Sequence, residues 1–207
     1  MVEKIKESLI KTYNETVEEY VKHEFENPSM EKHYKRFLSL IPRNSKILDV
    51  GCGPGQASKK FADFGNSIIG IDLSEKMIEF AKQKVKNAKF FVMDVENITI
   101  KEKFDAIWAA FILVHIPRQK HPKILKKFNE LLKPNGILYL GLIEGEGEKI
   151  MPEPYNRKYT QYFVFSQKKE IENNLKNTRF KLLDYSTETF NEEGDKFILS
   201  STFAKKI

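Results

Sequence analysis

Short apolar runs alternate with longer amphipathic segments through the middle of this chain of 207 residues, from Lys46 to Ile143. This order predicts strands alternating with helices, which is typical of an α/β fold built on a parallel sheet. Two helices are expected before the sheet, over residues 2–23 and 28–41. Asn27-Pro28 interrupts the first helical pattern and Pro42 ends the second.

A different pattern follows the predicted sheet. Residues 144–166 are rich in glycine and proline and show no clear period, so we expect an irregular segment there. A helix is predicted over residues 167–176, and two closing strands are predicted over 179–188 and 196–204. No linker divides the chain, and we therefore expect a single domain over residues 1–207.

Charge and composition narrow the classes of function. The formal net charge is +6 at pH 7, but it comes mainly from scattered lysines, and we interpret the densest runs, 82–89 and 118–133, as solvated helix faces. The single cysteine, Cys52, excludes a disulfide framework and favours a reducing compartment. No apolar run is long enough to span a membrane and no cleavable signal begins the chain, so we expect a cytoplasmic protein without a membrane partner.

Residues 47–56 (Ile-Leu-Asp-Val-Gly-Cys-Gly-Pro-Gly-Gln) carry the most chemical information. Three glycines stand on alternate positions after an apolar strand, as required where backbone turns sharply or lies against a ligand. A dinucleotide-binding loop would have its third glycine where Gln56 stands, and Pro54 removes an N–H that a pyrophosphate would use. No Lys-Ser/Thr pair follows, as a P-loop requires. The loop therefore favours a nucleoside ligand without phosphates.

Five segments in order resemble the motifs of the class I (Rossmann-like) S-adenosylmethionine-dependent methyltransferases. They are the glycine loop, residues 67–78 with a strand ending in Asp72, residues 90–95, residues 104–110 and residues 131–140. The resemblance implies a seven-stranded, mostly parallel sheet with helices on both faces, whose last strand is antiparallel and inserted beside its neighbour. A Leu-x-His-x-Pro segment followed by Glu-Gly-Glu-Gly-Glu is similar to a widespread, mostly uncharacterised bacterial subgroup of these enzymes.

The same resemblance divides the domain into functional parts. It implies an N-terminal helical cap over residues 1–41, a cofactor-binding core over 46–143 and a lid over 144–166, after the fifth strand. A C-terminal helix and closing strands would occupy residues 167–207.

The resemblance also implies how the glycine loop and the next strand hold the cofactor, S-adenosylmethionine. Backbone at Gly51 and Gly53 would contact its methionyl part, Gly55 would complete the loop, and Asp49 would lie near the ammonium group. Asp72 would bind the ribose hydroxyls. The residues alone leave a helix-capping acid as the alternative for Asp72.

The adenine side of the cofactor site follows in the same way. Leu73 and Met77 would flank the adenine, Asp94 would meet its amino group, and the Val95 N–H would reach a ring nitrogen. Backbone at Ala110 would close the site beneath the sulfonium. The alternative for Asp94 is an acid in an Asx turn.

Candidate residues for the acceptor side are fewer. His115 follows the fourth predicted strand, and an imidazole with an ordinary pKa near 6.5 suits a general base. The alternative is a histidine that only orients its loop. His23, His33 and His121 are expected at the surface. Polar and aromatic residues that could contact the acceptor are Tyr13, Glu144, Tyr155, Arg157, Tyr159 and Tyr162, the alternative being packing on the sheet edge or in the core.

Missing motifs bear on the acceptor. The Asp/Asn-Pro-Pro-Tyr/Phe motif of enzymes that methylate amino groups of bases and glutamine is replaced by Ala109-Ala-Phe-Ile, and no Pro-Cys nucleophile is present. No arginine-rich arm or RNA-binding module is found. We expect a small-molecule acceptor, a monomer or homodimer, and no metal site, because no cluster has ligand spacing. The alternatives are an RNA or protein methyltransferase that uses its lysine-rich surface, and a nucleotide-cofactor-binding module without turnover.

Overall fold

The computed structural model describes residues 2–25, 30–154, 156–192 and 195–207. The helices are α1 (Val2–Glu15), α2 (Val17–Phe25), α3 (Glu31–Ser39), α4 (Gln56–Asp63), α5 (Glu75–Lys84), α6 (His121–Leu131) and α7 (Lys168–Asn177). The strands are β1 (Lys46–Val50), β2 (Ser67–Asp72), β3 (Lys89–Val92), β4 (Phe104–Ala110), β5 (Leu132–Glu144), β6 (Glu148–Glu153), β7 (Asn156–Ser166), β8 (Phe180–Glu192) and β9 (Asp195–Lys206).

The mostly parallel sheet expected from the sequence is confirmed, but in the described residues it has nine strands rather than seven, because β6 and β7 extend it beyond β5. β3, β2, β1, β4 and β5 lie side by side and are parallel. β9 runs antiparallel along β5, and β8 pairs with the other edge of β9, so the last strand is inserted between its two neighbours. The chain leaves β1 toward β2 on one side and meets β4 on the other. A crevice at the carboxyl ends of these strands is the usual ligand site of such a sheet.

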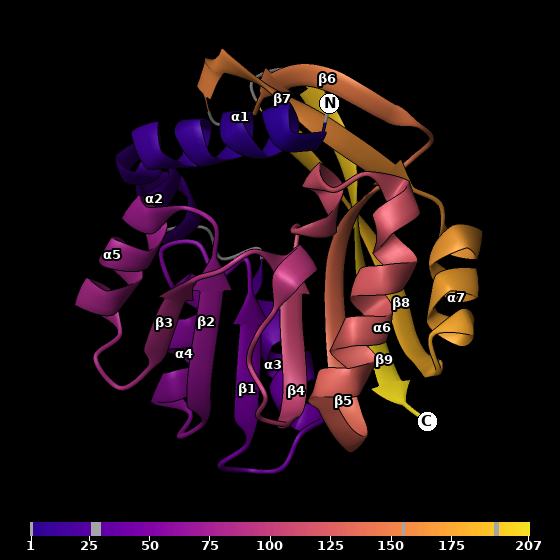
Figure 1. Ribbon diagram of the computed structural model, residues 1–207. Helices are drawn as coiled ribbons and strands as arrows, with labels where there is room; N and C mark the ends of the chain where they lie inside the picture. The colour runs from indigo at the N-terminus through magenta and orange to yellow at the C-terminus, as the bar shows by residue number, and fades with distance from the viewer. Residues whose placement is uncertain (1, 26–29, 155, 193–194) are drawn as a thin grey trace.

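Helices cover both faces of this sheet (Figure 1). Neighbouring strand residues enter opposite cores: Ile47 belongs to a cluster with side chains of α3, α4 and α5, whereas Leu48 belongs to one with side chains of α6 and α7. Trp108 and Tyr139 stack at 3.7 Å between ring centroids within the first cluster. This alternation follows from the two-residue period of a strand, and it holds the carboxyl edge of the sheet rigid.

Two predicted elements differ from the structure. The helix expected over residues 2–23 is divided, because α1 ends at Glu15 and α2 begins at Val17. Thr16 lies between them, and its hydroxyl donates to the carbonyl of Thr12 at 2.9 Å, a back-bond that commonly bends helices. The second N-terminal helix ends at Ser39 rather than at residue 41, and its expected start at residue 28 lies outside the described residues.

The sequence predicts an irregular segment over residues 144–166, but this segment forms a β-hairpin. β6 and β7 pair antiparallel, and the end of β7 pairs with the end of β5. Gly145 and Gly147 have φ angles of +150° and +81°, which lets the chain turn between β5 and β6. Pro152 is tolerated because β6 is an edge strand of the sheet.

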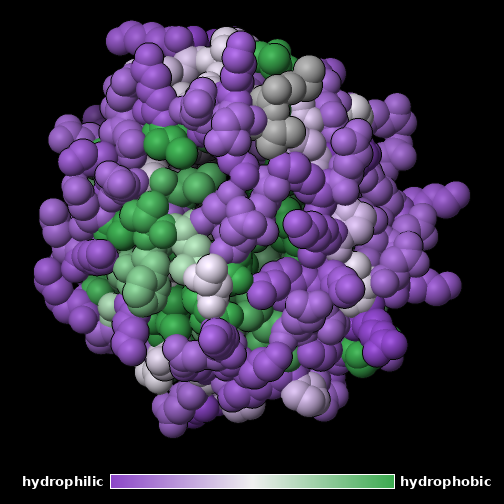
Figure 2. All heavy atoms as spheres, in the orientation of Figure 1, coloured by the Kyte–Doolittle hydropathy of each residue, from purple (hydrophilic) through white to green (hydrophobic). Residues whose placement is uncertain are grey.

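Helix α1 lies across the carboxyl edge of the sheet, between α5 and the β6–β7 hairpin (Figure 1). On the α5 side, the side-chain oxygen of Asn14 accepts a hydrogen bond from the Ser74 hydroxyl at 2.7 Å. On the hairpin side, the Gln161 amide donates to the Thr12 hydroxyl and the Tyr159 hydroxyl donates to Glu15 at 2.7 Å. These three hydrogen bonds hold α1 over a pocket. Figure 2 shows apolar side chains gathered below α1 on this face.

Candidate active site

The glycine loop forms the floor of the pocket beneath α1. Gly51, Gly53 and Gly55 all have positive φ angles, of 67°, 49° and 90°. The N–H groups of Gly51 and Cys52 donate to the carbonyl of Ile71, which fixes the loop against β2. Gly51 and Gly53 line the pocket, whereas a Cβ at Gly55 would lie 3.2 Å from Ala81 of α5. Gly55 therefore serves close packing of the loop on α5.

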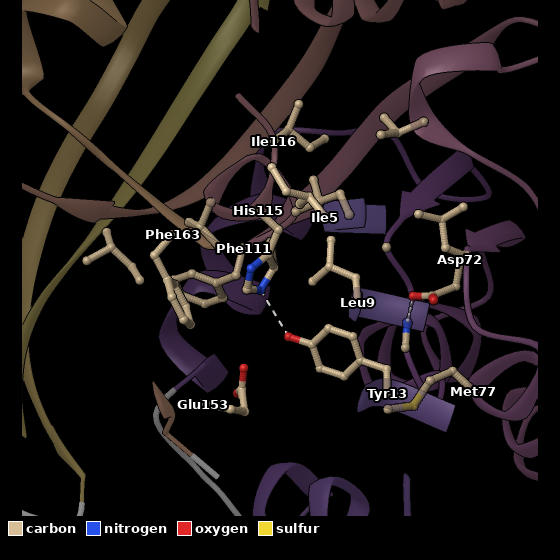
Figure 3. A pocket seen from close by; sticks show the side chains of 18 of the residues that line it. Ile5, Leu9, Tyr13, Asp72, Met77, Phe111, His115, Ile116, Glu153 and Phe163 are labelled. Carbon is tan, nitrogen blue, oxygen red and sulfur yellow. Dashed lines mark hydrogen bonds between the residues drawn. The ribbon is translucent and has the colours of Figure 1, made fainter. Parts of the chain in front are cut away.

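Asp72 joins the glycine loop to α5. Its carboxylate accepts hydrogen bonds from the N–H groups of Gly53 at 3.0 Å and Ser74 at 2.8 Å (Figure 3). Burial raises the pKa of Asp72, and these backbone donors oppose that shift. Ser74 caps α5 by accepting from the Met77 N–H at 3.1 Å, as the sequence predicts. Leu73 and Met77 line the pocket beside Asp72.

Asp49 and Cys52 lie under the loop. Asp49 is 1 % exposed and accepts a hydrogen bond from the Ser58 hydroxyl at 2.6 Å. Burial raises its pKa to about 7. The sequence predicts that Asp49 lies near the ammonium group of the cofactor. Asp49 is not among the residues that line the pocket, so the structure does not bring it to the ligand side. Burial also raises the pKa of the Cys52 thiol, which fits a packing residue.

Asp94 has two partners at the far end of the pocket. One carboxylate oxygen accepts from the Glu96 N–H at 2.8 Å, which is the Asx turn that the sequence left open. The other accepts from the Nζ of Lys6 in α1 at 2.6 Å, and Lys6 lies 2.8 Å from Glu96 as well. Val95 lines the pocket next to them.

His115 also lines the pocket, from a short 3₁₀ turn after β4. Its Nδ1 is 3.1 Å from the carbonyl oxygen of Tyr162, and its Nε2 is 3.0 Å from the hydroxyl of Tyr13 (Figure 3). A carbonyl only accepts, so Nδ1 carries the proton and Nε2 accepts from Tyr13. Burial lowers the pKa of His115 to about 4, and the imidazole is neutral at physiological pH.

Of the residues suggested for the acceptor side, Tyr13 and His115 line the pocket. The carbonyl of Tyr162 accepts a hydrogen bond from His115, and the hydroxyl of Tyr159 donates to Glu15. Arg157 is exposed, Glu144 lies partly buried at the end of β5, and Tyr155 lies outside the described residues. Other lining residues were not predicted, among them Ile5, Lys6, Leu9, Glu96, Phe111, Glu153, Phe163, Phe190 and Phe197.

Little in the sequence could have revealed these residues. Ile5, Leu9 and Tyr13 follow one another at intervals of four residues, which marks one face of a helix but not what that face covers. Glu153 lies in a segment whose strand pairing was not recognised.

The remaining histidines also differ from expectation. His33 is 4 % exposed and its Nε2 lies 2.9 Å from a carboxylate oxygen of Glu188. His121 is 3 % exposed, and its Nε2 donates to the carbonyl of Ile116 at 2.8 Å. Both were expected at the surface, and both are buried because a polar partner satisfies the ring. The side chain of His23 lies outside the described residues.

Within the described parts of the chain, no group of three or more His, Cys, Asp or Glu side chains could hold a metal ion. No described helix is long and apolar enough to cross a membrane.

The pocket suits a nucleoside with an attached amino acid. Backbone is exposed at Gly53, where a Cβ would meet only Tyr20 at 3.8 Å, so a ligand can approach the loop closely. Asp72 and Asp94 offer carboxylates on one side, and Leu73 and Met77 offer apolar surface between them. These carboxylates and this apolar surface fit the hydroxyl groups, amino group and ring of a nucleoside such as S-adenosylmethionine.

Comparisons with known proteins agree with this geometry. The family model described as a methyltransferase domain matches residues 47–136. An uncharacterised methyltransferase of Oceanobacillus iheyensis is 28 % identical over 146 residues, which cover 62 % of this chain and 68 % of that protein. A ubiquinone biosynthesis O-methyltransferase of Pelagibacter ubique is 36 % identical over 105 residues, covering 49 % of this chain and 43 % of the relative, so the match spans less than half of that protein.

A solved structure shares the whole architecture. The 1,6-didemethyltoxoflavin-N1-methyltransferase of Burkholderia thailandensis, with bound 1,6-didemethyltoxoflavin and S-adenosylhomocysteine, matches 100 % of this chain and 90 % of its own with a TM-score of 0.76 and 16 % identity. This likeness concerns the fold. The family match over residues 47–136, the related sequences and the fold agree with the glycine loop and its acids, and they support the resemblance to the class I S-adenosylmethionine-dependent methyltransferases.

Proposed function

We propose that this protein transfers the methyl group of S-adenosylmethionine to a nucleophile on a small-molecule acceptor held beneath α1. One observation carries the proposal: the glycine loop with Asp72, and the Tyr13–His115 pair, line the same covered pocket. The cofactor supplies a methyl group on a sulfonium, whose positive charge is lost on transfer. The protein has to hold both reactants and align them, and alignment of this kind can supply roughly 7–11 kcal/mol of the barrier.

The proposed roles of the pocket residues are those that the resemblance implies. The backbone of Gly51 and Gly53 would bind the methionyl part, Asp72 the ribose hydroxyls, and Asp94 the adenine amino group. His115 is neutral and accepts a hydrogen bond from the Tyr13 hydroxyl, so it positions the Tyr13 oxygen toward the acceptor. A base whose pKa is about 4 removes a proton poorly at neutral pH. The nucleophile of the acceptor therefore has to react without being deprotonated by His115.

The covered pocket favours a small acceptor over RNA or a protein. Helix α1 is bound to α5 on one side and to the β6–β7 hairpin on the other, so a polymer would have to displace the helix. The proposal includes the hairpin acting as a lid, a cytoplasmic location, and action as a monomer or homodimer without nucleic acid. Size-exclusion chromatography with light scattering measures the assembly state directly.

Calorimetric titration with S-adenosylmethionine, S-adenosylhomocysteine and NADH tests the proposal. We expect micromolar binding of the first two compounds and none of NADH. Asp72→Asn should weaken binding of S-adenosylhomocysteine roughly 10- to 100-fold, because one charge-assisted acceptor is lost. Asp63→Asn, at an exposed acid of α4 paired with Lys59, is the matched control and should bind normally. Binding of NADH alone would refute the proposed function.

A further inference from the structure

The chemistry of the acceptor can be read from the end of the pocket near His115. Apolar side chains make up much of the lining, including Phe111, Ile116, Phe163, Phe190 and Phe197. The ring of Phe163 lies 4.9 Å from that of His115, between centroids. Such a surface suits a flat, apolar molecule.

Polar groups at this end accept hydrogen bonds. The Nδ1–H of His115 donates to the Tyr162 carbonyl, which leaves Nε2 to accept a hydrogen bond from the Tyr13 hydroxyl. The Tyr13 oxygen then presents its lone pairs to a neighbour, because its one proton is used.

Glu153 adds a carboxylate. It stands at the end of β6, lines the pocket, and points toward the Tyr13–His115 pair (Figure 3). Only 3 % of the residue is exposed. A carboxylate in such surroundings is stabilised by hydrogen-bond donors or by a cation.

Acids outnumber basic side chains among the described residues that line the pocket. Among the described residues that line it, the acids are Asp72, Asp94, Glu96 and Glu153, and the only lysine or arginine is Lys6. Lys6 is bound to Asp94 and Glu96, which belong to the adenine end. An acceptor that carries a carboxylate or phosphate would meet like charge at the His115 end, at a cost in affinity.

We propose that the acceptor is an apolar, ring-containing molecule, uncharged or cationic, whose N–H or O–H groups donate to Glu153 and to the Tyr13 oxygen. This inference rests on the proposed function, since it names the molecule that the methyl group reaches. Glu153 is then a specificity-determining residue that selects against anionic acceptors.

Three naphthalene derivatives, carrying a hydroxyl, an aminomethyl or a carboxylate group, serve as matched probes. Their binding is measured by calorimetry on protein saturated with S-adenosylhomocysteine. We expect the hydroxyl and aminomethyl compounds to bind at least about tenfold more tightly than the carboxylate. Glu153→Gln should reduce the preference for the aminomethyl over the carboxylate compound at least about fivefold. Glu146→Gln, which removes an exposed acid bound to Gln167, should keep that preference.

Each remaining outcome separates this inference from the proposed function. Unchanged affinity for S-adenosylhomocysteine in Glu153→Gln shows that the variant folds, and Tyr13→Phe is a second variant that should weaken the hydroxyl probe. Equal binding of the three probes, no binding of any, or an unchanged preference in Glu153→Gln would refute the inference alone. Weaker binding of S-adenosylmethionine but not of S-adenosylhomocysteine in Glu153→Gln would assign the acid to the sulfonium and overturn it as well. Failure of the wild type to bind S-adenosylhomocysteine would instead contradict the proposed function.

Discussion

At the scale of single residues, two neighbours determine the protonation state of His115. The Tyr162 carbonyl accepts from Nδ1, and the Tyr13 hydroxyl donates to Nε2. Burial lowers the pKa of the ring to about 4, against an ordinary value of 6.5. We expect ¹⁵N-histidine NMR spectra to show a neutral ring with its proton on Nδ1, without a titration step between about pH 5 and about pH 8.

His115→Gln assigns the signal of this ring among the histidines. Tyr13→Phe is the informative variant, because it removes the donor to Nε2 and leaves the bond of Nδ1. The Nε2 resonance should shift in Tyr13→Phe while the Nδ1 proton persists. A proton on Nε2, or a titration midpoint near 6.5, would contradict the geometry and restore His115 as a conventional base.

At the scale of elements, α1 covers the cofactor side of the pocket as well as the acceptor side. Lys6 binds the Asp94 oxygen that is left over from the Asx turn, and this is the acid assigned to the adenine amino group. Under the proposed function, Lys6 and the adenine amino group compete for this Asp94 oxygen. A competing contact of this kind lowers the apparent affinity by the fraction of molecules in which it is formed.

Replacing Lys6 tests this competition. We expect Lys6→Gln to bind S-adenosylhomocysteine about two- to fivefold more tightly, since a partly exposed ion pair stabilises the covered state by roughly 0.2–1 kcal/mol. Lys4→Gln on the same helix is the control, because Lys4 is exposed and its replacement removes the same charge from α1. Calorimetry on both variants measures the difference. Weaker binding to Lys6→Gln would mean that Lys6 helps to hold the cofactor rather than competing with it.

At the scale of the whole molecule, the sequence predicts what local patterns encode and misses what tertiary contacts assemble. The glycine loop, the acid ending β2 and the Ser74 cap depend on neighbours in the sequence, and all were recognised. Lys6 and Glu153 are far apart in the sequence, but α1 and β6 bring them to the same pocket. Their neighbours in sequence give no sign of this. The hairpin was missed because its glycines and prolines resemble those of a loop, although Pro152 only marks an edge strand.

Two buried groups make the pH dependence of global stability a further property of the whole molecule. The pKa of Asp49 is raised from 3.8 to about 7, so between these values the folded state holds a proton that the unfolded chain has lost. Stability therefore falls as pH rises through this window. The pKa of His115 is lowered from 6.5 to about 4, so the unfolded chain binds the extra proton and stability falls as pH drops. The two contributions oppose each other over almost the same range.

Asp49→Asn should separate them. The variant keeps the hydrogen bond from Ser58 but does not titrate, so its unfolding free energy minus that of the wild type should increase by about 3 kcal/mol as pH rises from about 4 to about 7. His115→Gln should show the opposite trend, its advantage growing by about 3 kcal/mol as pH falls through the same range. Urea unfolding across this range measures both differences, and taking differences cancels the other carboxylates. A pH-independent difference for Asp49→Asn would mean that Asp49 is ionised in the folded protein, with its charge balanced at the glycine loop.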